Sequence, residues 1–134
     1  MKAKAATFAL AIFASAVAQA APGFCDFAGE YQGMYSGGVD HGSITALVSL
    51  DTGTVRGTAM SASGQAVPFR GVISATGAFS PAAAGGNADT GATFAGQFRE
   101  SDGEASGSGR WALAATGDGG QWQVARTSIP RTCQ

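Results

Sequence analysis

The only histidine of the chain, His41, stands in the segment GGVDHGS, directly after Asp40 and two residues before Ser43. Serine, histidine and aspartate are the residue types of a nucleophilic triad, in which the imidazole takes the hydroxyl proton and the carboxylate orients the ring. Three residues this close in sequence rarely converge in that geometry. The segment is therefore interpreted as a solvated loop, and no catalytic residue is predicted.

The remaining polar residues do not predict a metal or cofactor site either. A zinc site needs three or four ligands, and the chain offers one histidine, two cysteines and scattered acids. Glu100, Asp102 and Glu104 cluster at one expected turn but lack the spacing of a calcium loop. The glycines flank strand-forming residues and do not build a phosphate-binding motif before a helix. We expect no cofactor, no metal and no enzymatic activity.

The first residues have the layout of a secretory leader. Two lysines precede an uncharged apolar run, and the small residues AQA follow it. We predict a signal peptide over residues 1–20, cleaved near Ala20/Ala21, and a single domain over residues 21–134. A non-cleaved anchor is the alternative, although the apolar run is shorter than the roughly 20 residues that cross a bilayer as a helix. The mature chain is expected in the periplasm or outside the cell, without a membrane span.

The two cysteines, Cys25 and Cys133, lie near the two ends of the mature chain. Export takes cysteines into an oxidising compartment, where they form disulfides. Thiols for metal or redox work usually stand close together, as in C-x-x-C, and the residues APGF before Cys25 do not fit a lipidation site. We therefore predict an intramolecular disulfide between Cys25 and Cys133.

The charges of the mature chain do not suit a nucleic-acid partner. Removal of the leader removes both lysines and leaves six arginines, spread singly, against nine carboxylates. A nucleic-acid binder needs a clustered basic face to replace the phosphate counterions. Nucleic acid is therefore not expected as a partner.

The elements that position these residues are predicted to be strands. After the leader no apolar stripe with helical spacing appears, and short segments with alternating apolar residues are separated by turn residues. Short connections between successive strands indicate an antiparallel up-and-down meander. About eight strands are expected, over residues 29–36, 43–50, 55–61, 66–74, 78–82, 91–98, 105–113 and 121–126.

Glycine and aromatic residues alternate on one face of these strands, as in the opening stretch GEYQGMYSGG. The inner face of a small, strongly curved sheet cannot hold large side chains at every position, so large and small residues must alternate there. Glycine also lets an aromatic ring of the next strand lie across its backbone. The expected core rings are Tyr31, Tyr35, Phe69, Phe94, Phe98, Trp111 and Trp122. A weaker interpretation places Tyr31, Tyr35, Trp111 and Trp122 at a barrel mouth, where they would hold a sugar or an apolar ligand.

The cysteines also bear on whether the sheet closes. Eight strands laid flat would separate the first from the last by about 34 Å, whereas a disulfide needs Cα atoms within roughly 4.4–6.8 Å. An all-β, closed or nearly closed barrel satisfies this constraint, and a β-sandwich is the alternative. A transmembrane barrel is not expected, because strands of six to eight residues fall short of the roughly 9–11 that span a bilayer and outward positions hold Ser, Thr, Gln and Arg.

Several of these segments together carry a resemblance. The series GEYQGMYSGG, GVISATGAFS, TGATFAGQF, GSGRW and GGQWQVAR resembles a group of small, Gly-rich bacterial secreted and lipoprotein-type β-meander domains of uncharacterised function. The likeness covers nearly all of the mature chain, apart from the lipidation cysteine of the lipoprotein members. It implies an envelope or secreted β-domain and no particular activity.

Three functions follow as hypotheses. The first is an exported, non-catalytic β-barrel that acts as an envelope or secreted binding or structural module. The second is a small secreted inhibitor or protein-interaction domain that uses the loop Gly38–Ser43 or the loop Ala83–Asp89. The third is a lipocalin-like carrier of a small apolar ligand. The corresponding partners are an envelope protein or such a ligand.

Overall fold

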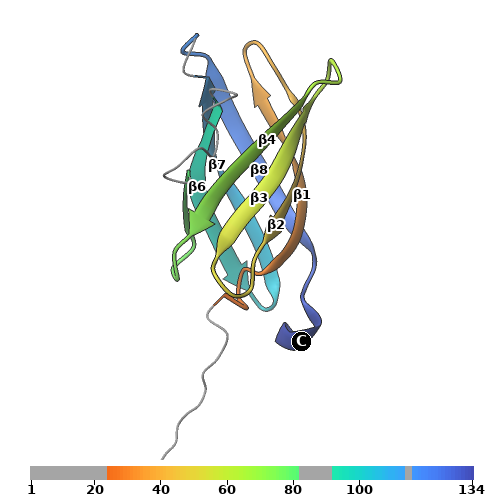
Figure 1. Cartoon of the computed structure of the whole chain (residues 1–134), viewed down its shortest axis with the longest axis vertical. Helices are drawn as coiled ribbons and strands as arrows, with labels where there is room; N and C mark the ends of the chain where they lie inside the picture. The colour runs from red at the N-terminus through yellow and green to blue at the C-terminus, as the bar shows by residue number, and fades with distance from the viewer. Residues whose placement is uncertain (1–23, 82–91, 114–115) are drawn as a thin grey trace, which may run out of the picture.

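The computed structural model describes residues 24–81, 92–113 and 116–134, and these residues form eight antiparallel strands followed by one turn of 3₁₀ helix (Figure 1). The predicted signal peptide, residues 1–20, and the predicted loop Ala83–Asp89 lie outside the described residues. The elements are β1 (Gly29–Gly37), β2 (Gly42–Val48), β3 (Thr54–Ser61), β4 (Ala66–Ile73), β5 (Ala78–Pro81), β6 (Ala92–Ser101), β7 (Glu104–Leu113), β8 (Gly119–Ser128) and η1 (Arg131–Cys133).

The strands pair in sequence order and close into a barrel. The ladder that closes it joins β1 to β8 and runs from the pair Glu30–Ser128 to the pair Gly37–Gly120, with an irregularity after Glu30. The first described residues and the C-terminus lie at the same end of the barrel, as an even number of strands requires (Figure 1). The predicted all-β meander and its closure are confirmed, and the β-sandwich alternative is wrong.

Several strand ends differ from the prediction. Strand β2 ends at Val48 instead of residue 50, because the backbone turns there: Ser49 N–H donates to Thr54 O at 2.9 Å and Gly53 N–H donates to Ser49 O at 3.2 Å. Strands β6, β7 and β8 have 10 residues each, more than the eight, nine and six residues predicted for them. Strand length therefore does not distinguish these three strands from membrane-spanning ones. No helix among the described residues has the length and apolar character needed to cross a membrane.

The hairpin between β6 and β7 shows why two of these strands are long. Asp102 and Gly103 form its two-residue loop and both have positive φ, at 55° and 84°. This is the backbone that an Asp-Gly pair adopts in a tight hairpin turn, whose twist matches that of the strands beside it. Glu100 accepts a hydrogen bond from Gly103 N–H at 2.8 Å. The ladder consequently continues without interruption to the pair Ser101–Glu104.

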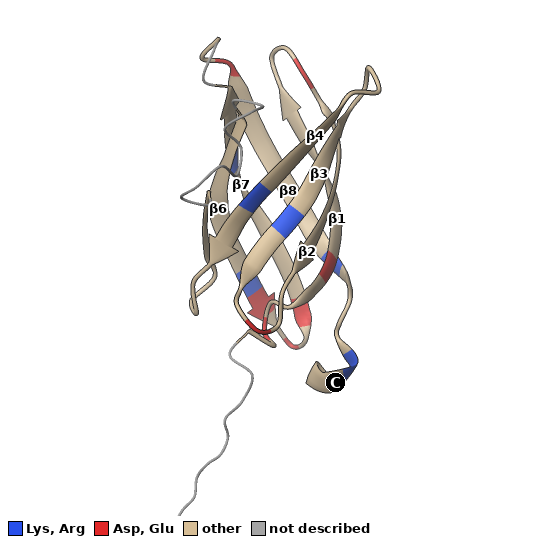
Figure 2. Cartoon of the chain, in the orientation of Figure 1, with Lys and Arg blue, Asp and Glu red and all other residues tan. Residues whose placement is uncertain are grey.

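The charged residues follow this architecture. Five of the six arginines lie on strands, and most of the described carboxylates lie in or beside the turns at the two barrel ends (Figure 2). Asp in a turn accepts hydrogen bonds from nearby backbone N–H groups. Most of the charged side chains on the strands of the barrel wall are therefore arginines.

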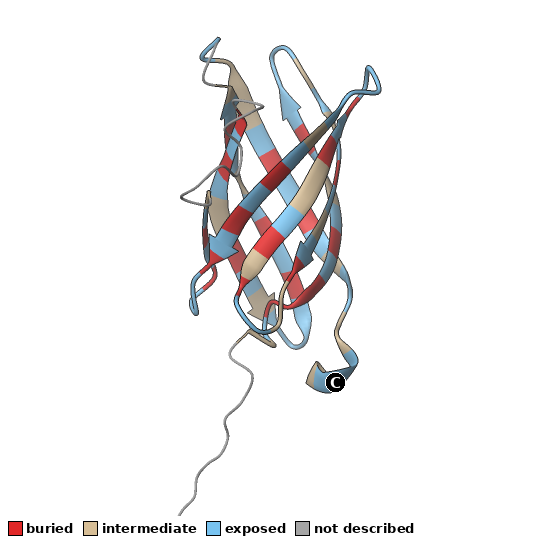
Figure 3. Cartoon of the chain, in the orientation of Figure 1, coloured by how far each residue is buried: buried red, intermediate tan, exposed pale blue. Residues whose placement is uncertain are grey.

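The core lies inside the barrel, and buried residues alternate with exposed ones along the strands (Figure 3). All seven rings of the predicted core set are buried, the most exposed at 5%. Phe27 and Phe79 are buried as well, although neither was in the predicted set. Phe27 precedes β1 in a turn and Phe79 lies on the four-residue strand β5, so neither has a long alternating pattern around it.

Glycines opposite the rings make this packing fit. Gly57 on β3 faces Phe69 on β4, and the ring of Phe69 occupies the place where a side chain of residue 57 would begin. Gly107 on β7 faces Phe98 on β6 in the same way, since a Cβ there would lie 2.9 Å from the ring. At these two positions the structure confirms the prediction that glycine lets an aromatic ring of the next strand lie across its backbone.

Candidate functional site

The loop between β1 and β2 is fastened across the barrel end opposite the termini. Its anchor is the carboxylate of Asp40, which accepts hydrogen bonds from the Tyr35 hydroxyl and the Ser61 hydroxyl, each at 2.8 Å. The same carboxylate accepts a third hydrogen bond from the backbone N–H of His41 at 2.9 Å. Tyr35 and Ser61 belong to β1 and β3, so this one side chain ties the loop to two strands.

These contacts shift the acidities of both partners. Partial desolvation acts to raise the pKa of Asp40, but the hydrogen bonds from Ser61, Tyr35 and the backbone of His41 outweigh it and lower that pKa below its ordinary value. Burial, together with the hydrogen bond to Asp40 and its negative charge, raises the pKa of Tyr35 to about 12. Asp40 is therefore a hydrogen-bond acceptor, and Tyr35 a donor, throughout the neutral range.

The triad that residue types alone suggest is not assembled. Asp40 bonds to the backbone of His41 and not to its ring, and its two oxygens are already used by Tyr35 and Ser61. His41 and Ser43 are both exposed on the outside of the barrel. The loop instead presents Val39, which is 63% exposed, next to its anchor. Such a geometry favours recognition by an anchored apolar residue over proton transfer.

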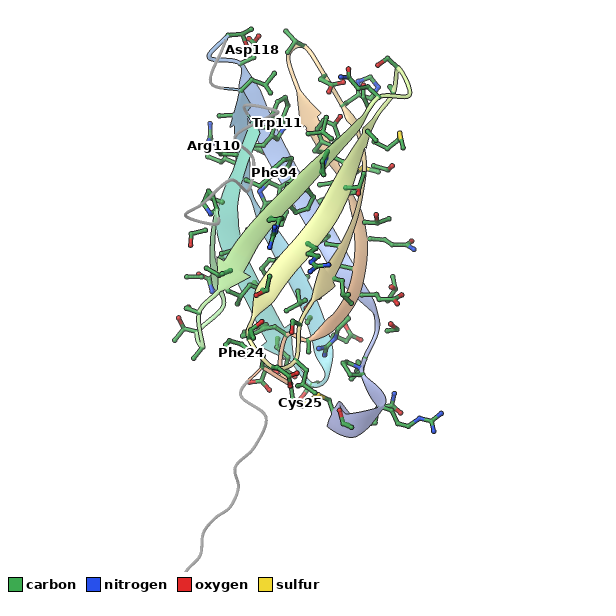
Figure 4. The ribbon with its side chains drawn as sticks, viewed as in Figure 1. Phe24, Cys25, Phe94, Arg110, Trp111 and Asp118 are labelled. Atoms are coloured by element: carbon green, nitrogen blue, oxygen red, sulfur yellow. A yellow bond between two sulfur atoms is a disulfide. The ribbon has the colours of Figure 1, made fainter. Side chains whose placement is uncertain are left out.

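The two tryptophans use their polar atoms on the backbone. Trp111 packs edge-on against Tyr35 with ring centroids 5.5 Å apart, and its indole N–H donates to Ser36 O at 3.0 Å. The indole N–H of Trp122 is shared between Ala95 O at 3.2 Å and Arg110 O at 3.1 Å. Figure 4 shows Trp111 near the same barrel end as Asp118. With their donors satisfied and their rings buried, both tryptophans belong to the core.

The interior holds very little free space. An internal cavity of about 10 Å³ lies among core side chains of β2–β6 and β8, including Phe69, Phe94 and Trp122. A cavity of roughly this volume is at the lower limit for a single water. Tyr31, Tyr35, Trp111 and Trp122 therefore line no internal ligand site within the described barrel.

The opposite end is closed by the segment before β1. Cys25 and Cys133 form the predicted disulfide, with Cα atoms 5.4 Å apart, and so join this segment to η1. The buried Tyr31 hydroxyl donates to Phe27 O at 2.7 Å and holds the turn over the core. Burial raises the pKa of Tyr31 to about 12, although the positive charge of Arg126 acts in the opposite direction.

Arg126 is a second fastening at this end. Its guanidinium donates to the carbonyl oxygens of Asp26 at 3.0 Å, Ala28 at 2.9 Å and Gly103 at 2.8 Å, with a longer contact to Cys25 O at 3.3 Å. It thus links the segment before β1 to the β6–β7 hairpin. Sequence reasoning did not assign Arg126 a role, because its partners at the chain start are about 100 positions away and are backbone atoms.

Together these features define a disulfide-linked, closed eight-stranded β-barrel with a filled interior and one anchored end loop. In the part of the chain that the structure describes, no three His, Cys, Asp or Glu side chains lie together as a metal site would require. Comparisons of the chain with protein-family models, with curated proteins and with solved structures found no match.

Proposed function

We propose that this protein is an exported, non-catalytic β-barrel that serves a bacterial cell as a binding or structural module of the envelope or the exterior. The observation that carries the proposal is that the cavity among the described core side chains has a volume of only about 10 Å³. A barrel without internal space offers partners its outer wall and its end loops. The carrier hypothesis has no internal site among the described residues, so it is not pursued.

Export is supported by two features of different kinds. The first 20 residues have the layout of a secretory leader, and the structure contains a disulfide, which persists in oxidising compartments and is rare in the cytosol.

Lack of catalysis is supported by Asp40, whose oxygens are hydrogen-bonded to groups other than the imidazole of the only histidine.

Export can be tested with the full chain expressed in a bacterium that has a periplasm. We expect the protein in the periplasm or the medium, with Ala21 as its first residue and no thiol that reacts before reduction. A matched chain in which Leu10 and Ile12 are replaced by lysine should stay inside, because charge in the apolar run abolishes leader function. Retention of the natural chain in the cytoplasm with two free thiols would refute export.

A protein-interaction role is the second candidate, and the loop between β1 and β2, residues 38–41, favours it. Val39 is 63% exposed on a loop that Asp40 anchors to β1 and β3, so its display costs little ordering on binding. Exchange of Val39 for Ser should then abolish capture of an envelope protein that the natural chain retains. Val72, 44% exposed on the outer wall, provides the matched control for the same exchange. Equal capture by both variants would exclude the loop as the contact.

A further inference from the structure

Two arginines stand side by side on the outer wall. Arg56 on β3 and Arg70 on β4 are directly paired across the two strands, and both are exposed. They form the adjacent blue bands on β3 and β4 in Figure 2. Along the same row, Leu47 of β2 separates Arg56 from Glu30 of β1. The row therefore has a compact cationic end formed by two guanidinium groups.

This pairing is electrostatically unfavourable unless an anion lies near it. Side chains directly opposite each other in antiparallel strands have Cβ atoms about 4.5–5.5 Å apart, and like charges at that distance repel. Arg70 also has an interaction partner of its own within the chain. Arg56 is therefore the guanidinium group that an external anion would chiefly neutralise. Guanidinium groups offer planar forks that match carboxylate, sulfate and phosphate oxygens.

The two arginines border a groove suited to a polar polymer. An open groove of about 700 Å³ lies over the outer face of β1–β4. Glu30 also lines it, at the far end of the arginine row, and Gln32, Thr45 and Thr58 supply an amide and two hydroxyls in the neighbouring row. Hydroxyls and amides both donate and accept hydrogen bonds, as sugar hydroxyls do.

The backbone under this groove is not free to pair with a ligand. Strands β2 and β3 are each hydrogen-bonded on both sides, to β1 and β3 and to β2 and β4 respectively. A peptide laid over them could not add itself as a strand, which is the usual source of affinity for extended peptides. A ligand there must be recognised through side chains alone. This favours a carbohydrate over a polypeptide.

We infer that the outer face of β1–β4 binds an acidic polysaccharide, with Arg56 holding one of its acidic groups and Thr45, Thr58 and Gln32 contacting its hydroxyls. This names the partner class of the binding module and so rests on the proposed function. Carboxylate and sulfate groups share the required chemistry, and separate probes distinguish them. Because the Arg56 side chain is exposed to solvent, salt should screen its attraction to the acidic group, and binding should weaken as the salt concentration rises.

The test is equilibrium binding of the purified, disulfide-linked protein to immobilised polygalacturonate and to heparin, with neutral dextran and poly-glutamate alongside. Arg56→Gln should weaken binding about tenfold, the expected effect of losing a charge-assisted hydrogen bond. Arg110→Gln is the matched control, because Arg110 stands exposed on β7 opposite Ala95 and Gln121, away from the groove (Figure 4). Near-ultraviolet circular dichroism of the tryptophans checks that each variant remains folded.

Binding to either acidic polysaccharide that Arg56→Gln weakens and Arg110→Gln preserves supports the inference, and the better of the two probes identifies the acidic group. Equal loss in both variants would reduce it to general charge attraction and overturn it. Equally tight binding of poly-glutamate, or no binding of either acidic polysaccharide, would also overturn it. The proposed function would still stand in those cases, because export and disulfide formation are measured independently.

Discussion

At the scale of single residues, burial keeps the hydroxyl groups of the two tyrosines protonated, so that both remain hydrogen-bond donors. Tyr31 seals the terminal end through Phe27 O, and Tyr35 fastens the opposite end through Asp40. Burial is the main cause that raises the pKa of each to about 12. Both hydroxyls are thus donors at any pH at which the protein is expected to work.

The pKa shifts predict a loss of stability in alkali. The unfolded tyrosines lose their protons near pH 10, whereas the folded ones keep them up to about pH 12. The stabilisation is therefore fully present below pH 10 and is lost as the pH rises from about 10 to 12. For the buried Tyr31 the loss is at most about 2.7 kcal/mol. Near-ultraviolet absorbance of tyrosinate in the folded protein measures the titration. The variants Tyr31→Phe and Tyr35→Phe show which tyrosine gives each part of the titration curve.

The chain has only two tyrosines, so the titration curve separates into two contributions. A folded protein in which either tyrosine titrates near pH 10 would contradict the burial of that ring. The removal of one tyrosine should leave the titration of the other near pH 12, because they lie at opposite ends of the barrel.

At the scale of the element, pairs of glycine and aromatic residues set how closely neighbouring strands pack their inner faces. Gly57→Ala should reduce the free energy of unfolding by about 1–3 kcal/mol, because the new methyl group overlaps the ring of Phe69 and lies 2.6 Å from Thr45 O. Denaturant unfolding measures the difference. The matched control is Gly38→Ala, since a Cβ at residue 38 meets no atom within 4 Å. Equal stability of the two variants would contradict the role of glycine as a floor for the ring.

Strand patterns explain what the sequence predicts well at this scale. The alternation that places Tyr31, Phe69, Phe94 and Trp111 inward is repeated over several residues, so it identified strand and face together. Phe79 and Phe27 escaped because a four-residue strand and a turn have no such repeat. The C-terminal end of β2 depends on backbone hydrogen bonds among Ser49, Gly53 and Thr54, and residue types alone do not determine these bonds.

At the scale of the whole molecule, the barrel is closed by the β1–β8 ladder and reinforced by the disulfide. The ladder extends over most of β1, whereas the sulfur link lies outside it and joins the segments before β1 and after β8. The cysteines alone imply that the edges meet, but they do not show that hydrogen bonds join the two strands. The disulfide therefore secures an end that is already formed.

Removal of the disulfide should weaken the barrel without opening it. The double exchange Cys25→Ser and Cys133→Ser should lower the free energy of unfolding by about 2–5 kcal/mol, as for a long closed loop. The circular dichroism of Trp111 and Trp122 should persist, because the β1–β8 ladder and the core stay in place. Loss of that signal in the native buffer would show that the disulfide, and not the ladder, holds the barrel closed.

The candidate site was predicted only in part. A loop was expected over Gly38–Ser43, whereas the structure begins β2 at Gly42, and the anchoring of Asp40 by Tyr35 and Ser61 was not expected. Ser61 lies 21 residues from Asp40, and only the register of β2 with β3 brings it near the loop. The pairing of Arg56 with Arg70 likewise depends on the β3–β4 register.

Residue types and their alternation were enough to predict the eight strands, most of the buried rings and the pairing of the cysteines, because alternation and turn chemistry are properties of neighbouring residues. The β1–β8 ladder, the four carbonyl contacts of Arg126 and the paired guanidinium groups on the outer wall are visible only in the folded barrel. These depend on register between strands, which is the outcome of packing the whole core at once. The pattern of residues along one strand does not specify its register with the next strand.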